Sequence, residues 1–142
     1  MIIPDVNLLI YAVFDGYSQH ARASVWLNGA LSGMEDVGLT APAVFGFVRL
    51  GTNPRVHEDP LSVDGATDYV NEWLGRPQVR FLASGADHVR TTLRLLAEVG
   101  TGANLTTDAQ LAAFAVEFGG TIYSNDSDFG RFADVRWVNP LS

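Results

Sequence analysis

The sequence contains no cysteine and no lysine. The absence of cysteine excludes disulfides, thiolate nucleophiles and cysteine-type zinc sites, and it fits a protein of the reducing cytoplasm. Because all nine basic residues are arginine, chemistry that depends on a lysine amine, such as a P-loop or a Schiff base, is excluded as well. The longest apolar run, residues 41–48, is far below the roughly 20 residues that span a bilayer, so we expect no membrane span.

Positive charge is scarce overall, since the formal net charge is −7. This argues against a protein that binds polyanions through its surface charge alone, because such domains are usually basic. The length of 142 residues and the hydrophobic fraction of 47% fit an ordinary globular protein with a real core. We therefore expect a single domain over residues 1–142.

Short apolar runs alternate with longer stretches of helical periodicity along the chain. Strands are predicted at 2–3, 37–40, 79–82, 121–123 and 135–138, and helices at 8–13, 18–33, 43–50, 63–74, 85–100 and 104–119. Strands and helices that alternate in this way indicate a mostly parallel sheet flanked by helices on both faces. The predicted fold is an α/β three-layer sandwich.

The apolar positions also predict which helix faces are buried. The second helix is expected to face the core with Ala21, Val25, Leu27 and Leu31, and the fifth with Val89, Leu93, Leu96 and Val99. Large aromatic side chains are mostly buried in proteins, and on that ground the core is expected to include Trp26, Phe45, Phe47 and Trp73. A capping box, Thr107-Asp108-Ala109-Gln110, is predicted at the start of the last helix.

Carboxylates occur at the junctions where a parallel sheet forms its crevice. Asp5 follows the first strand, Asp108 lies in the first turn of the last helix, and Asp126 and Asp128 follow the fourth strand. Two carboxylates about 4 Å apart repel by roughly 4 kcal/mol at an effective dielectric constant near 20. If these side chains converge, the cluster must take up protons or bind a cation.

Oxygen ligands without cysteine favour a hard divalent ion, Mg²⁺ or Mn²⁺. Phosphodiester chemistry is the commonest use of such an ion, since it activates water and offsets charge on the phosphate. A structural interpretation stays open for each acid: Asp5 as a helix N-cap, Asp108 as a capping-box residue and Asp126 as a turn residue. The three histidines lack metal-ligand spacing.

Four segments carry a resemblance to a known family. They are Ile3-Pro4-Asp5-Val6-Asn7, the run from Phe47 to Arg55, the run from Leu105 to Ala113, and Ser124-Asn125-Asp126-Ser127-Asp128-Phe129. In this order, and on this succession of strands and helices, they resemble the PIN-domain ribonucleases, and among these the VapC toxins of bacterial toxin–antitoxin pairs. The resemblance covers nearly the whole chain.

The resemblance implies a Mg²⁺- or Mn²⁺-dependent endoribonuclease toxin of the cytoplasm. In family terms Asp5, Asp108 and Asp126 are the catalytic, metal-binding acids, and Asp128 assists them as a further ligand. A cognate VapB-type antitoxin is expected to bind a groove between helices and to direct a basic side chain toward the acids. The resemblance further implies a homodimer, and structured substrates such as tRNA or ribosomal RNA.

One position departs from the family pattern. A glutamate usually stands immediately before the Phe47-Val48-Arg49 run, and this chain has Gly46 there. The loss of one acid is expected to weaken metal binding unless Asp128 or substrate oxygens compensate. The alternative function is therefore a catalytically weak PIN-like module that binds RNA or the antitoxin.

Polar residues near the acids complete the predicted site. Asn7 and Ser124 are expected to orient the metal-binding acids by hydrogen bonds. RNA contacts are assigned to Arg49, Arg55 and Arg131, since a metal brings positive charge to the cleft and nearby arginines extend it. The structural alternative for each arginine is a solvated charge or an ion pair with an aspartate.

Overall fold

The computed structural model describes residues 1–142 and contains one five-stranded sheet. The strands are β1 (Ile2–Pro4), β2 (Val37–Leu39), β3 (Val79–Phe81), β4 (Thr121–Tyr123) and β5 (Arg136–Val138). Their order is β3-β2-β1-β4-β5, and every neighbouring pair is parallel. The first strand is buried and lies at the centre of the sheet, as its uninterrupted apolar sequence predicts.

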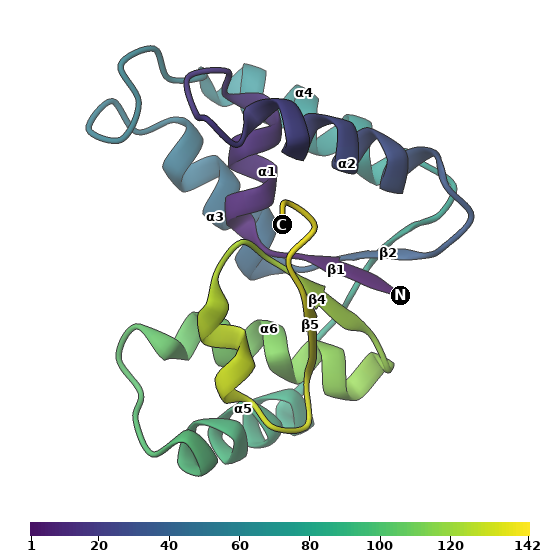
Figure 1. The fold of residues 1–142 in the computed structure, drawn as a ribbon, viewed down its shortest axis with the longest axis vertical. Helices are drawn as coiled ribbons and strands as arrows, with labels where there is room; N and C mark the ends of the chain where they lie inside the picture. Colours follow the sequence, from purple (N-terminus) through teal and green to yellow (C-terminus); the bar gives the residue numbers. More distant parts are fainter.

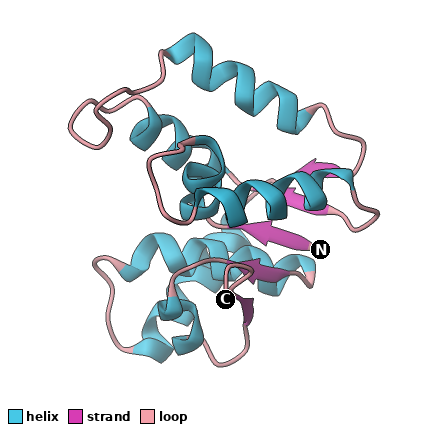
Figure 2. Ribbon diagram, turned by 45° about the horizontal axis from the view of Figure 1, so that its top comes forward, coloured by secondary structure: helices cyan, strands magenta, loops and turns pink.

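Helices cover both faces of this sheet (Figure 1). One layer contains α1 (Val6–Val13), α2 (His20–Ser32), α3 (Ala41–Gly51) and α4 (Val63–Leu74), and the other contains α5 (Ala86–Val99), α6 (Leu105–Phe118) and the 3₁₀ helix η1 (Ser127–Arg131). Figure 2 shows the strands between the two helical layers. The predicted α/β three-layer sandwich is therefore confirmed. None of the helices combines the length and the apolar character needed to cross a membrane.

The buried face of α5 differs in part from the prediction, because Leu96 and Val99 pack against the core as expected, although they are only partly buried. Val89 and Leu93 are 56% and 60% exposed, whereas His88, Thr92 and Leu95 face the core. The buried polar groups are satisfied, because the Thr92 hydroxyl donates to the backbone carbonyl of His88 at 2.8 Å and His88 Nδ1 lies 3.1 Å from a carboxylate oxygen of α6. Apolar periodicity could not identify this face, since two of its buried side chains are polar and are satisfied by one hydrogen bond within α5 and one contact with α6.

The prediction for α2 is half right. Leu27 and Leu31 are buried, but Val25 is 74% exposed and Ala21 is exposed. Ala23 occupies the inward position in place of these two, and it packs in a small cluster with residues of α1 and the C-terminal tail. A small side chain at that position allows the two helices to approach closely.

The predicted capping box of α6 is wrong. The helix begins at Leu105 with Asn104 as its N-cap residue, and no side chain caps it. Thr107 consequently lies within the first turn and not before it. Asp108 is thereby placed as the fourth residue of the helix, and its carboxylate is not used as a cap.

Apolar side chains are exposed on one part of the surface formed by α3, β3 and α5. Phe45 is 66% exposed, which contradicts its assignment to the core, while Phe47 and Trp73 are buried as expected and Trp26 is partly buried. Phe81 of the edge strand β3 is 52% exposed. Phe45 and Phe81, together with Val89 of α5, border a hollow that α6 also lines.

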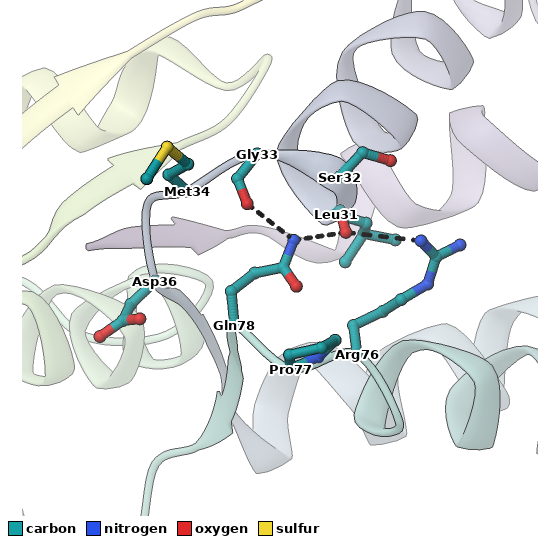
Figure 3. A pocket seen from close by; sticks show the side chains of 8 residues that line it. All are labelled: Leu31, Ser32, Gly33, Met34, Asp36, Arg76, Pro77 and Gln78. Atoms are coloured by element: carbon teal, nitrogen blue, oxygen red, sulfur yellow. Dashed lines mark hydrogen bonds between the residues drawn. The ribbon is translucent and has the colours of Figure 1, made fainter.

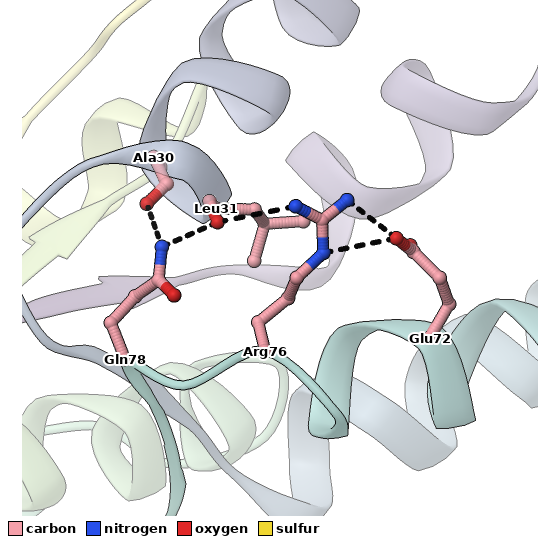
Figure 4. Close-up of polar contacts among 5 residues, drawn as sticks. All are labelled: Ala30, Leu31, Glu72, Arg76 and Gln78. Carbon is pink, nitrogen blue, oxygen red and sulfur yellow. Dashed lines mark hydrogen bonds and ion pairs between the residues drawn. The ribbon is translucent and has the colours of Figure 1, made fainter.

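The C-terminal end of α2 is tied to the segment before β3. The Gln78 side-chain amide donates to the backbone carbonyls of Ala30 and Leu31, and the Arg76 guanidinium, paired with Glu72, donates to Leu31 as well (Figure 4). The same amide donates to the carbonyl of Gly33. These donors satisfy carbonyls that the end of a helix leaves unpaired. The contact fixes the end of α2 against the segment that leads into β3.

A shallow hollow of ≈ 580 Å³ adjoins this contact (Figure 3). Its lining includes Asp36 and Gln78, which directly precede β2 and β3. The hollow therefore lies at the amino ends of the strands, opposite the edge where ligands bind in open parallel sheets. The candidate acids lie at that other edge.

Candidate metal centre

The sheet order brings the first strand and the fourth strand together at the centre of the fold. Ile2, Ile3 and Pro4 of β1 pair in parallel with Thr121, Ile122 and Tyr123 of β4. The residues that follow, Asp5 and Ser124, therefore emerge side by side at the carboxyl edge of the sheet. The Asp5 backbone amide donates to the carbonyl of Tyr123 at 2.9 Å, which extends the pairing to this point.

Asp5 is buried, and each of its two carboxylate oxygens accepts one hydrogen bond. Oδ1 accepts from the Val6 backbone amide at 2.7 Å, and Oδ2 accepts from the Ser124 hydroxyl at 2.7 Å. The pKa of Asp5 is raised overall. Burial raises this pKa most, the nearby charge of Asp126 adds to the rise, and the two hydrogen bonds oppose it. Asp5 is also the N-cap residue of α1. The same side chain therefore caps a helix and lies among the candidate metal ligands.

Three further aspartates converge beside it. Asp108, Asp126 and Asp128 each place one carboxylate oxygen within 4.8 Å of the other two. Burial raises the pKa of Asp108 to about 7, with additional contributions from the negative charges of Asp5, Asp126 and Asp128. Asp5 does not belong to this close trio, but its charge acts on Asp108. The fold therefore brings the four predicted acids into one region, with three of them close together and Asp5 beside them.

A hydrogen-bond network built on Ser124 orients these acids. The fully buried Ser124 hydroxyl donates to Asp5, and it accepts from the Asn7 amide at 3.2 Å and from the Asp126 backbone amide at 2.9 Å. Asp126 Oδ1 in turn accepts from the Asp128 backbone amide at 2.9 Å, which begins η1. Asn7 and Ser124 are thus placed where the sequence predicts orienting groups.

Two residues of this network were not identified from the sequence. The Asn139 side-chain amide donates to Asn125 Oδ1 at 3.2 Å, and the Trp137 indole donates to the Ser124 carbonyl at 3.0 Å. Both lie in or just after β5, next to the loop that carries Asp126. An asparagine immediately after the last strand is the signal that was available, because it lies at the carboxyl edge of the sheet.

The three candidate arginines are exposed and take part in none of the six ion pairs of the structure. Arg131 ends η1, the short helix that also contains Asp128. Arg49 lies in the last turn of α3, and Arg55 lies beyond that helix. Only Arg131 is therefore joined to the acids by a short segment of chain.

The three histidines lie in other interactions. His20 Nδ1 is 2.8 Å from the Tyr11 carbonyl, His57 Nδ1 is 3.0 Å from the Leu50 carbonyl, and His88 contacts Glu117. Since a carbonyl only accepts, the first two nitrogens donate. The candidate centre is therefore composed of oxygen ligands alone, which suits a hard divalent cation.

Comparison with known proteins identifies relatives along nearly the whole chain. A family model described as the PIN domain matches residues 2–135. The chain is 49% identical over 141 residues to Ribonuclease VapC33 of Mycobacterium tuberculosis, with 99% of each protein covered. It is 44% identical over 140 residues to Ribonuclease VapC37 of the same organism, with 99% of this chain and 97% of the relative covered.

Solved structures with the same fold share little sequence with the chain. The VapBC2 complex of Rickettsia felis bound to promoter DNA contains a chain that matches with a TM-score of 0.70 at 14% identity, covering 98% of both chains. VapC20 of M. tuberculosis, a toxin that cleaves the sarcin–ricin loop, matches with a TM-score of 0.71 at 19% identity, covering 96% of this chain and 99% of the other. At such identities the likeness concerns the fold.

Proposed function

The chain belongs to the PIN-domain family, as an endoribonuclease toxin of the VapC type, and from this premise we propose that Asp5, Asp108 and Asp126 are its catalytic metal ligands. The observation that carries the proposal is the convergence of aspartates from three separate segments. Burial, together with the charges of the neighbouring aspartates, raises the pKa of Asp108 to about 7. A cluster of this kind is stabilised by a cation. The proposed cofactor is Mg²⁺ or Mn²⁺.

The residues present fit such an ion, because they offer only carboxylate oxygens and hold several of them within 4.8 Å of one another. A divalent ion supplies a Lewis acid beside the scissile phosphate and lowers the pKa of water, which phosphodiester hydrolysis requires. The protein's part is to hold the acids in place. Ser124 and the Val6 amide fix the Asp5 carboxylate, and the Ser124 hydroxyl also holds the Asp126 backbone.

Gly46 stands where the family pattern has a glutamate, so catalytic activity depends on whether another residue supplies that carboxylate. The residue is buried in α3, and a Cβ atom added there would lie 3.1 Å from Val6 Cγ2. The position that carries a glutamate in the family pattern is therefore packed against α1 in this chain. We propose that Asp128 supplies the missing carboxylate. If it does not, the chain is a catalytically weak module that binds RNA or the antitoxin.

The substrate is proposed to be a structured RNA of the tRNA or ribosomal RNA class, cut in the cytoplasm. The metal would bring positive charge to an otherwise acidic protein, and Arg49, Arg55 and Arg131 are proposed to contact phosphates. The absence of these three arginines from the ion pairs supports this role, because their charges are not neutralised within the chain.

Two protein partners are proposed. A VapB-type antitoxin is the expected partner, since similar folds occur in VapBC complexes. We also propose a homodimer, supported by the exposed apolar side chains Phe45, Phe81, Val89 and Leu93, because large exposed apolar patches commonly mark contacts between proteins. Light scattering at several protein concentrations tests the dimer, and a Phe81→Ser, Leu93→Ser double variant is expected to be monomeric.

The test of the activity is cleavage of a structured RNA pool by the purified protein with Mg²⁺, with Mn²⁺ and with EDTA. Asp5→Ala and Asp126→Ala, carried through the same purification, exclude a contaminating nuclease. The proposal predicts cutting that requires the metal and is lost in both variants. If the wild type cuts no better than the variants at saturating Mn²⁺ but still binds RNA or antitoxin, the alternative function takes its place.

A further inference from the structure

The C-terminal tail after β5 reaches back to the candidate metal centre. Leu141 is buried beside Leu8 of α1 and Ala23 of α2, and the Arg22 guanidinium donates to the Leu141 carbonyl at 3.0 Å. Figure 1 shows this tail returning beside α1. Asn139 begins the tail, and its Oδ1 accepts from the Leu141 backbone amide at 3.0 Å.

Asn139 is the tail's polar contact with the loop after β4. Its amide donates to Asn125 Oδ1 at 3.2 Å. The Asn125 backbone amide lies 3.4 Å from Asn7 Oδ1, and the next residue, Asp126, donates its backbone amide to the Ser124 hydroxyl at 2.9 Å. The loop that carries Asp126 is therefore held from α1 on one side and from the tail on the other.

This loop bears carboxylates that repel one another. Asp126 and Asp128 have oxygens within 4.8 Å of each other and of Asp108, so without an ion their charges push the loop away from α6. Ligands that are held in place before the ion arrives bind it more tightly than ligands that must first be ordered. A hydrogen bond that resists the outward movement of the loop should therefore increase metal affinity.

We propose that Asn139 is a positioning residue of the metal centre, which acts through Asn125 to hold the Asp126 carboxylate in its ion-binding position. The inference rests on the proposed function, because it requires that Asp126 be a metal ligand. Removal of hydrogen-bonding groups that orient metal ligands typically lowers metal affinity by about 10- to 100-fold. The single contact through Asn125 places the expected loss at the lower end, about 10-fold.

The test measures Mn²⁺ affinity of the full chain by isothermal titration calorimetry, without RNA. The variants are Asn139→Ala, Asn125→Ala and the double variant. We expect about 10-fold weaker binding for Asn139→Ala, and a double variant that binds no more weakly than Asn125→Ala alone, because the two side chains act through one contact. Affinity of Asn139→Ala within twofold of the wild type, or losses that multiply in the double variant, would overturn the proposal.

Arg22→Ala is the matched control for a general loosening of the tail. It removes the other polar anchor of Leu141 but does not touch the loop after β4. We expect it to lower the melting temperature while its Mn²⁺ affinity stays within twofold of the wild type. A loss of Mn²⁺ affinity equal to that of Asn139→Ala would mean that a loosened tail, and not the bond to Asn125, weakens metal binding. Asn139→Ser keeps an oxygen for the Leu141 amide but is too short to reach Asn125, and it carries the test if Asn139→Ala does not fold.

Asp126→Ala separates this inference from the proposed function. If the wild type does not bind Mn²⁺, or if Asp126→Ala binds it equally well, the proposed centre fails and the role of Asn139 fails with it. If the wild type binds Mn²⁺, Asp126→Ala does not, and Asn139→Ala matches the wild type, only the inference about Asn139 is wrong.

Discussion

Replacing Asp108 by asparagine should stabilise the metal-free protein. Burial and three neighbouring carboxylates raise the pKa of Asp108 from 3.8 to about 7. A rise of about three pH units corresponds to at most roughly 4 kcal/mol at 1.36 kcal/mol per unit. Because the side chain is only partly buried and solvent screens its charge, we expect about half of this, roughly 2 kcal/mol at pH 8 for Asp108→Asn.

The pH dependence of this difference follows from the direction of the pKa change. Between pH 3.8 and about 7 the folded state retains a proton at Asp108 that the unfolded state has released, so rising pH removes stability from the wild type. The gain in unfolding free energy of Asp108→Asn over the wild type should be small near pH 4 and should reach its full value above pH 7. Urea unfolding in EDTA at several pH values measures it, with the exposed Asp134→Asn at the other end of the sheet as the charge-matched control.

Metal should reverse the order of stability. An ion at 1,000 times its dissociation constant stabilises a folded protein by about 4.1 kcal/mol, and Asp108→Asn should lose most of this gain because it lacks a ligand. A difference between wild type and Asp108→Asn that does not change from pH 4 to pH 8, or that equals the difference for Asp134→Asn, would refute the electrostatic argument.

Further substitutions test the scaffold and the RNA surface. Gln78→Ala should lower the free energy of unfolding in urea by about 1–2 kcal/mol, since carbonyls at the end of α2 lose their donor, with RNA cleavage unchanged; a loss of cleavage would contradict the separation of that contact from the site. Gly46→Ala should destabilise the wild type by contact with Val6, yet stabilise a Val6→Ala background by up to about 1 kcal/mol through helix propensity; the same sign in both backgrounds would disprove the packing argument. Arg131→Ala should weaken RNA binding in fluorescence anisotropy and reduce the salt slope by about 1, and an unchanged slope would place Arg131 outside the RNA surface.

The sequence predicts the order of strands and helices because each short apolar run is bounded by strong local signals. Pro42 in the first turn of α3 and Gly100 after α5 are examples, and Gly100 adopts the left-handed conformation (φ 85°) expected of a helix end. Helix faces were harder to predict. The inward face of α5 carries the polar residues His88 and Thr92: His88 pairs with Glu117 of α6, and Thr92 donates to a carbonyl of its own helix.

The candidate acids could be predicted for a related reason. Parallel strands end at the same edge of a sheet, so Asp5 and Asp126 had to approach each other once β1 and β4 were neighbours. The same reasoning places Asn139 at this edge, because it follows β5 directly, but it does not predict what Asn139 contacts. Its role depends on a hydrogen bond to Asn125 in the loop after β4, and no pattern within a single segment indicates such a bond.

The central claim is that Asp5, Asp108 and Asp126 bind a divalent ion. The most direct test is a crystal structure of the protein with saturating Mn²⁺, in which anomalous scattering locates the metal. We expect a peak with carboxylate oxygens of all three residues in its coordination sphere, and loss of that peak in Asp108→Asn crystals. An ordered site without anomalous density between these carboxylates, or a peak that contacts none of them, would show that these aspartates are not the metal ligands.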